Sequence, residues 1–538
     1  MKATYLLPAI PIAAAVAGVI FLIAMRFRRL RWVALAWYTL SLPALALIAY
    51  RFWEHYVGPD TFSIWRFGLT TSNISFILPL AVASPLLIWV VENKGLGGKR
   101  EGAASALACF GLAATLAAVL SDHLLLLAGL FTLASWCMVA SIALRGRKAG
   151  RLLAFLFPLG LADLCLVLGV LFLYLDDPTR GLFFPASPLE TGGMLSAACA
   201  LMLAASLLRL GSFPLHRWMA GVSEGGKDLR LVHLLAVDIT LGVFLLLAVN
   251  RSFFQWDGIW VWVCLGISAL TLLELLRELL HASGREEAWG LLCASLGAGL
   301  ALVASPGGQA AAAAARLGLW AGVPALALVN LGSEGGEKRA WTKVVGGASL
   351  LGMPPLAGFA WLWLGFGVLA GEFAGGETVL FLAAIPLLLA GAMVMGAVSL
   401  LLPDGGEEKT PAALAVAGGI LLTACGVAVG LYPGRMVDLL MREYGLPVEM
   451  PFTSWTSLGW AVLICVGLAV IILSAWTQRR GGERMKETTT NRSLPLLMSE
   501  RSFALPLLEK GRARAAIVLC DLLLYMAWAA VMVFLSLK

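Results

Sequence analysis

The sequence has little charge and few residues of the kinds that hold cofactors. Only 13% of its 538 residues are charged, whereas 60% are hydrophobic. It has five histidines, and its nine cysteines lie singly within apolar segments, so their spacing suggests no disulfide framework and no iron–sulfur or zinc site. We therefore expect no cofactor, no metal and no catalytic chemistry belonging to this chain alone.

Most of the sequence consists of long apolar runs. The mean hydropathy is +0.88, and about sixteen largely apolar runs are long enough to cross a bilayer as helices. The sequence therefore predicts an all-α, polytopic membrane protein with about sixteen transmembrane helices. We expect no separate soluble domain.

The basic residues gather in alternate loops. Of the 39 Lys and Arg residues, 29 lie in one set of loops, eight lie on the opposite side and two lie inside spans. Cytoplasmic loops are enriched in Lys and Arg, so this bias predicts that both termini are outside. We expect a multi-pass protein of the inner (cytoplasmic) membrane or an equivalent energy-coupling membrane. The net charge of +7 then reflects topology, and we expect contact with lipid and none with nucleic acid.

One stretch, Arg209–Gly225 with the sequence RLGSFPLHRWMAGVSEG, places a cation and a helix break in an otherwise apolar span. Pro214 removes a backbone donor, and the carbonyl that it frees must be met by protein or water because lipid cannot bond to it. Such breaks mark transport sites in many transporters. The alternative is a proline kink beside an Arg209 side chain that extends to the membrane interface.

The predicted spans also repeat. Helices four to eight occupy 103–249, and helices nine to thirteen occupy 256–402. Each block holds one cation inside a span, Arg209 or Arg316, and one Gly/Pro break, the second at Pro354 and Pro355. Because five is odd, the second block is inverted, which is typical of transporters whose polar path lies between the repeats. Chance is the alternative, since Gly and Pro are common in membrane helices.

The rest of the chain flanks these repeats. We expect helices one to three within 1–102, helices fourteen and fifteen within 411–476, a short cytoplasmic amphipathic linker at 477–514 and an anchoring helix at 515–538. Two Leu-Pro steps interrupt the linker. Even if fully helical it would reach only about 55 Å, so we expect it to hold at most one neighbouring subunit.

These breaks carry a family resemblance. The stretch FPLHRWMAGVSEG resembles the FPLHxWLPDAMEG signature of the antiporter-like membrane subunits of respiratory complex I, membrane-bound hydrogenases and multisubunit cation/proton antiporters. GMPPLAGF is similar to the GIPPLAGF break in the twelfth helix of that family, and Asp163 stands where the distal, longest subunit type has an Asp in helix six. The resemblance implies fourteen core helices, with breaks in helices seven and twelve, in a complex of several membrane subunits. The signature residues that match are Phe213, Pro214, Leu215, His216, Trp218, Glu224 and Gly225.

The departures from the family pattern change the predicted chemistry. The resemblance places Arg209 and Arg316 at positions where the family has Lys, and Leu362 where a last Lys follows the second break. The family's Glu on helix five falls near 129–132, where this sequence has no acid. The imidazole of helix eight moves one position to His233, and Asp238 is introduced.

The physical consequence is a pair of fixed charges. Burial lowers the pKa of a Lys enough for it to exchange protons, whereas an Arg stays protonated. A buried guanidinium needs a carboxylate partner. We predict that Asp163 and Asp238 are the counter-ions of Arg209 and that Arg316 is more isolated. The alternative leaves Asp163 in a polar crevice without a partner.

Two further residues lie at the predicted cytoplasmic end of the broken helix. His216 and Glu224 indicate either an access path for protons or a solvated loop. Glu274, Arg277 and Glu278 are interpreted as charges at a helix end.

Two classes of function follow. The first is a subunit that contributes to proton or cation translocation in an energy-converting complex such as a quinone- or hydrogenase-linked oxidoreductase, with Asp163, His233, Asp238 and water forming the path. Within this class, the alternative host is an inorganic-carbon uptake system with a zinc-containing partner. The second class is a non-pumping structural subunit. In each case we expect other membrane subunits, and also a soluble cytoplasmic subunit, as partners.

Overall fold

The computed structural model describes residues 6–27, 29–55, 71–92, 99–121, 123–144, 149–177, 193–224, 229–253, 259–282, 284–333, 340–369, 384–402 and 413–431. Its regular elements in these ranges are helices. They are α1 (Leu6–Ala24), α2 (Leu30–His55), α3 (Thr71–Glu92), α4 (Lys99–Leu120), α5 (Leu124–Leu144), α6 (Ala149–Asp176), α7 (Met194–Arg209), α8 (Arg217–Ser223), the π-helix η3 (Leu229–Ile239), α9 (Thr240–Ser252), α10 (Ile259–His281), α11 (Arg285–Ala304), α12 (Gly308–Ser333), α13 (Ala340–Leu350), α14 (Ala357–Leu369), α16 (Ala384–Leu401) and α17 (Ala413–Leu431).

The helical lengths confirm the predicted class. Within the described ranges, nine helices are long and apolar enough to cross a membrane, and five shorter apolar helices accompany them. The protein is therefore an all-α, polytopic membrane protein. The predicted spans after residue 431, the linker at 477–514 and the anchoring helix at 515–538 lie outside the described residues, so the total of sixteen stays a prediction.

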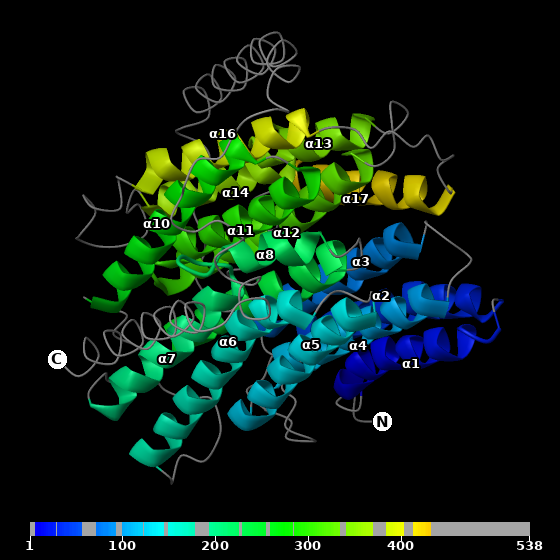
Figure 1. Ribbon diagram of the computed structural model, residues 1–538, viewed down its shortest axis with the longest axis horizontal. Coiled ribbons are helices and arrows are strands. Elements are labelled where there is room, and N and C mark those ends of the chain that lie inside the picture. Colours follow the sequence, from blue (N-terminus) through cyan, green and yellow to red (C-terminus); the bar gives the residue numbers. More distant parts are fainter. Residues whose placement is uncertain are drawn as a thin grey trace, which may run out of the picture.

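The helices form a continuous bundle around a buried centre. Figure 1 shows α1, α2, α4 and α5 packed together in blue and cyan, and α13, α16 and α17 on the opposite side in green and yellow. Distant segments meet between them, where α3 packs against α12 and α17. Within one apolar 18-residue window of each span, 94% of the residues are buried in 229–252 and in 285–304, whereas 33% are buried in 30–51. The π-helix η3, α9 and α11 therefore form the centre, and α2 lies at the rim.

The two broken helices end in the same way. Gly211 after α7 and Gly352 after α13 have positive φ angles of 72° and 75°. The amide of each glycine donates to the carbonyl three residues earlier, and the next amide donates to the carbonyl five residues before it. This is the Schellman arrangement, in which a left-handed glycine satisfies the last carbonyls of a helix. A cis peptide bond precedes both Pro214 and Pro355.

The helix packing is also similar beside the two breaks. α6 lies along α7 as α12 lies along α13. The division into two five-helix repeats, 103–249 and 256–402, and their inverted relation stay predictions.

Glycines of α11 hold the first break in position. A Cβ atom at Gly290 would lie 2.4 Å from the Cα of Ala220 in α8, and one at Gly297 would lie 2.4 Å from the carbonyl oxygen of Leu210. Real Cβ atoms do not approach other atoms so closely, because interiors are packed at near-crystalline density. The break therefore rests directly on the backbone of α11, and its place in the bundle is fixed.

Candidate functional site

Arg209, the last residue of α7, is at the centre of a buried charge cluster. The residue is 1% exposed, so its side chain does not extend to the interface as the alternative required. Its Nη1 donates to Asp238 Oδ1 at 2.6 Å, and its Nη2 donates to Asp163 Oδ1 at 2.7 Å. Both predicted counter-ions therefore contact Arg209, and Asp163 does not lie alone in a crevice.

Helix α5 supplies two further contacts that the sequence did not suggest. Arg209 Nη2 donates to Ser135 Oγ at 2.5 Å and to the carbonyl oxygen of Phe131 at 2.9 Å. The guanidinium also lies 5.0 Å from the centre of the Phe131 ring, within the range of a cation–π contact. Neutral oxygens of α5 thus face the cation from the helix on which the resemblance implies a Glu.

The cluster is short of positive charge. One guanidinium faces two carboxylates, and Asp238 Oδ2 is buried with no hydrogen-bond partner in the described part of the chain. An ionised carboxylate that is buried and incompletely paired costs several kcal/mol. A proton or a small cation on a carboxylate oxygen would remove that excess charge. The Asp163 side chain, 12% exposed, is the most accessible of the three charged groups.

A π-helix brings Asp238 and His233 to one side. Both residues lie in η3, where hydrogen bonds join residues five apart, and five positions separate them. His233 is fully buried, its Nε2 lies 3.2 Å from Ser141 Oγ, and a Cβ atom at Gly111 would lie 3.3 Å from its ring. π-Helices often occur at functional sites. The extra residue per turn was not visible in the sequence because it lies within an apolar run.

The second predicted fixed cation, Arg316, faces an aromatic ring. Arg316, in α12, is buried with its guanidinium 5.9 Å from the centre of the Phe76 ring. It is not among the contacts of Arg209. Leu362, where the resemblance implies a Lys, is fully buried, and its Cδ1 lies 2.4 Å from the place of a Cβ at Gly352. The leucine therefore fills the space beside the second break.

His216 lies at the end of the first break, immediately before α8. It is 4% exposed, so the prediction of a solvated loop is wrong for this residue. Its Nε2 lies 3.3 Å from Glu278 Oε2, and Arg217 Nε lies 3.2 Å from Glu278 Oε1. Glu278, interpreted from the sequence as a helix-end charge, is therefore a partner of His216. Glu224, the other residue of that prediction, is partly exposed at the C-cap of α8.

A second ion pair lies at the C-terminal end of α8. Arg230, buried in η3, contacts Glu286 of α11 at 3.2 Å. Ser223 donates to the backbone carbonyl of Glu286. Because α8 is so short, these contacts fix both its ends to α10 and α11.

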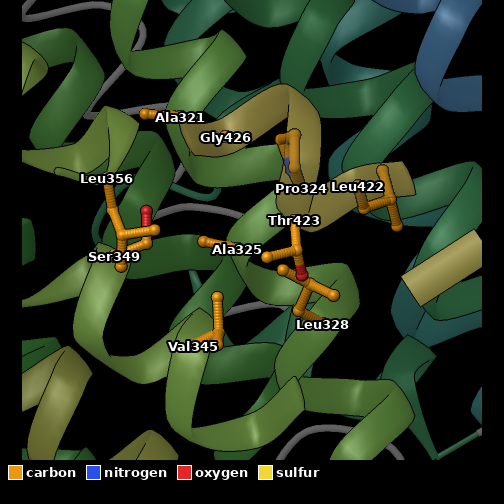
Figure 2. A pocket seen from close by; sticks show the side chains of 10 residues that line it. All are labelled: Ala321, Pro324, Ala325, Leu328, Val345, Ser349, Leu356, Leu422, Thr423 and Gly426. Carbon is orange, nitrogen blue, oxygen red and sulfur yellow. The ribbon is translucent and has the colours of Figure 1, made fainter. Parts of the chain in front are cut away.

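A small cavity lies beside the second break, and Figure 2 shows its walls. Its volume is about 10 Å³, room for about one water molecule. Pro324, which removes a backbone donor from α12, and Thr423, whose buried Oγ1 has no hydrogen-bond partner in the described part of the chain, both face it. The lining residues are Ala321, Pro324, Ala325, Leu328, Val345, Ser349, Leu356, Leu422, Thr423 and Gly426. Within the described residues, no group of three His, Cys, Asp or Glu side chains is placed to bind a metal ion.

Comparison with known proteins identifies the fold. No family model and no curated protein matches the chain. A chain of the Mrp complex from Dietzia sp. DQ12-45-1b superposes with a TM-score of 0.70 at 16% identity, over 99% of this chain and 63% of that one. This chain therefore spans less than two thirds of the Mrp chain.

Two other solved complexes contain similar chains. One is respiratory complex I from Thermus thermophilus with bound aureothin, with a TM-score of 0.61 at 19% identity, over 79% of this chain and 99% of that one. The other is the membrane-bound sulfane sulfur reductase, an archaeal respiratory membrane complex, with a TM-score of 0.72 at 14% identity, over 97% of this chain and 92% of that one. These superpositions establish a shared fold, and at identities this low they establish the fold alone. They confirm the antiporter-like resemblance at that level.

Proposed function

We propose that this chain is an antiporter-like membrane subunit that contributes to proton, or cation, translocation in a multisubunit energy-converting complex. The observation that carries the proposal is the contact of Arg209 with both Asp163 and Asp238, buried beside a helix break. Buried ionisable groups within spans are costly and commonly mark ion paths. The shared fold supports assembly with other membrane subunits. A soluble cytoplasmic subunit is a further partner that we propose.

The carboxylates are the groups that exchange the proton. Arg209 stays charged throughout, because a guanidinium does not lose its proton in proteins. A proton on Asp163 or Asp238 makes the cluster neutral, and its release leaves one negative charge. The residue types therefore reverse the chemistry that the resemblance implies, in which the titrating group is a Lys. His233, five residues from Asp238 in η3, is the nearest imidazole in sequence to receive or supply that proton.

The test measures proton flux in vesicles reconstituted with the purified complex. Asp238→Asn keeps the shape of the side chain and removes its titration, so we expect normal assembly with at least tenfold lower flux. The matched control is Asp176→Asn at the exposed end of α6. Wild-type flux in the double variant Asp163→Asn with Asp238→Asn would show that the cluster carries no protons.

One observation favours the structural alternative. Leu362 cannot titrate, and it fills the second break with apolar volume. A non-pumping subunit would assemble with its partners and leave flux unchanged when the cluster of Arg209 is neutralised. The same vesicle assay therefore separates the two functions.

The identity of the host complex can be determined from its other chains. Identifying the proteins that co-purify, and assaying them for iron–sulfur clusters and zinc, separates an oxidoreductase from an inorganic-carbon uptake system.

A further inference from the structure

A second ionisable pair leads from the surface toward the first break. Glu278 on α10 lies between the partly exposed Arg217 and the buried His216. The Glu278 side chain is 13% exposed, and its Oε2 lies 3.3 Å from Nε2 of the buried imidazole. Arg217 also lies 4.0 Å from Glu287 of α11. Charged groups from α8, α10 and α11 thus converge at this point.

Helix α10 contacts the break in two places. Besides the approach of Glu278 to His216, Thr271 Oγ1 accepts the amide N–H of Phe213 at 2.8 Å. Thr271 and Glu278 are seven residues apart, which is about two helical turns, so they lie on the same face. One face of α10 therefore holds the break and also presents the carboxylate.

Buried polar atoms without a hydrogen-bond partner in the described part of the chain lie within the first break. Neither ring nitrogen of His216 makes a hydrogen bond within the described part of the chain, although Nε2 faces Glu278. Ser212 Oγ, inside the same break, is also buried without a partner there. Ser212 is three residues from Arg209, so the chain between them spans at most about 11 Å. Buried donors and acceptors left unbonded cost free energy, and a water or a passing proton would satisfy them.

We propose that Glu278 and His216 form the relay that loads protons into the first break, with Ser212 between His216 and the cluster of Arg209. This inference rests on the proposed function. A proton that reaches Glu278 passes to Nε2 of the neutral imidazole, and the Nδ1 proton leaves toward Ser212. The relay ends on Asp163 or Asp238. The sequence prediction of an access path at His216 thus gains a carboxylate partner, Glu278, in place of Glu224.

The chain offers a matched control on the same helix. Glu274 lies one turn before Glu278, and its Oε2 accepts from Arg277 Nε at 3.0 Å on the exposed side of α10. Arg277 also acts on Glu278 through its charge, as Arg217 does. Glu274→Gln therefore removes a carboxylate from the same helix and the same surroundings without touching His216.

The experiment compares Glu278→Gln, Glu278→Asp and Glu274→Gln in the complete complex, reconstituted in vesicles. We expect at least tenfold lower flux for Glu278→Gln, recovery of at least half the flux for Glu278→Asp, and no change for Glu274→Gln. Complex yield and the midpoint of thermal unfolding are measured for each variant, because a merely structural role would lower both in Glu278→Gln.

The outcomes separate this inference from the proposed function. Normal flux in Glu278→Gln, with flux lost in Asp238→Asn, would overturn the relay and leave the central cluster in place. Lower flux that follows complex yield in all three variants would also overturn it. Normal flux in Glu278→Gln and in the double variant Asp163→Asn with Asp238→Asn alike would remove the proposed function itself.

Discussion

Replacement of Arg209 is the sharpest test of the buried cluster. Arg209→Ala removes four hydrogen bonds, two of them to carboxylates, and leaves Asp238 ionised at 1% exposure without its cation. Breaking a buried ion pair from one side typically costs about 3–5 kcal/mol. Since a whole domain is stable by only about 5–15 kcal/mol, we expect a large loss of assembled complex.

Two further variants divide that cost into charge and geometry. Arg209→Lys keeps the charge but replaces the planar fork by a compact ammonium, so one side chain no longer reaches Asp163 and Asp238 together. We expect an intermediate yield. In the triple variant Arg209→Leu, Asp163→Leu and Asp238→Leu, no ion is left buried, and well-packed apolar replacements of ion pairs are often neutral. We expect most of the stability to return without any flux.

The assay is the yield of intact complex by size-exclusion chromatography, together with its thermal unfolding and its proton flux in vesicles. Arg209→Ala that assembles at wild-type yield and pumps at the wild-type rate would refute the reasoning. The cluster would then be neither a structural element nor a path.

Other expectations follow from packing and topology. Gly290→Leu forces a side chain into the backbone of α8, so we expect a loss of about 1–3 kcal/mol or more, seen as a lower midpoint of thermal unfolding. Gly129→Ala is its control, because a Cβ atom there meets nothing within 4 Å. For orientation, a single cysteine placed at Arg147 should be labelled from the cytoplasmic side and one placed at Val437 from outside. Labelling of both from the same side would contradict the predicted topology.

The sequence revealed the centre of the site because charge is scarce in this chain. With 13% charged residues, an Arg inside an apolar span had few acids within reach, and Asp163 and Asp238 were the ones inside neighbouring spans. The neutral hydrogen-bond partners of Arg209 could not be recognised in the sequence in this way. Ser135 and the carbonyl of Phe131 look like any other residues of an apolar helix, and only the packing of α5 against α7 shows that they face Arg209.

Contacts between helix ends that are distant in the sequence could not be predicted for a different reason. Glu278 follows Arg277 at the end of a long apolar run, which is typical of a solvated helix end, and 62 residues separate it from His216. Its role depends on how α8 is placed against α10, and the short contacts of α11 glycines decide that placement. The π-helix was missed because an added residue shifts the helical register without changing the apolar composition.

The two breaks share a backbone arrangement but not a chemistry. From 209 to 217 the first break carries Arg209, His216 and Arg217, whereas residues 344–369 around the second break include no ionisable side chain. Beside the second break there is a cavity for about one water molecule, and the buried residue where the resemblance implies a Lys is Leu362. A left-handed glycine and a proline are therefore sufficient to break a membrane helix, but they do not by themselves create a proton site. The proposed function depends on the side chains of the first break, and it is there that substitution should separate transport from assembly.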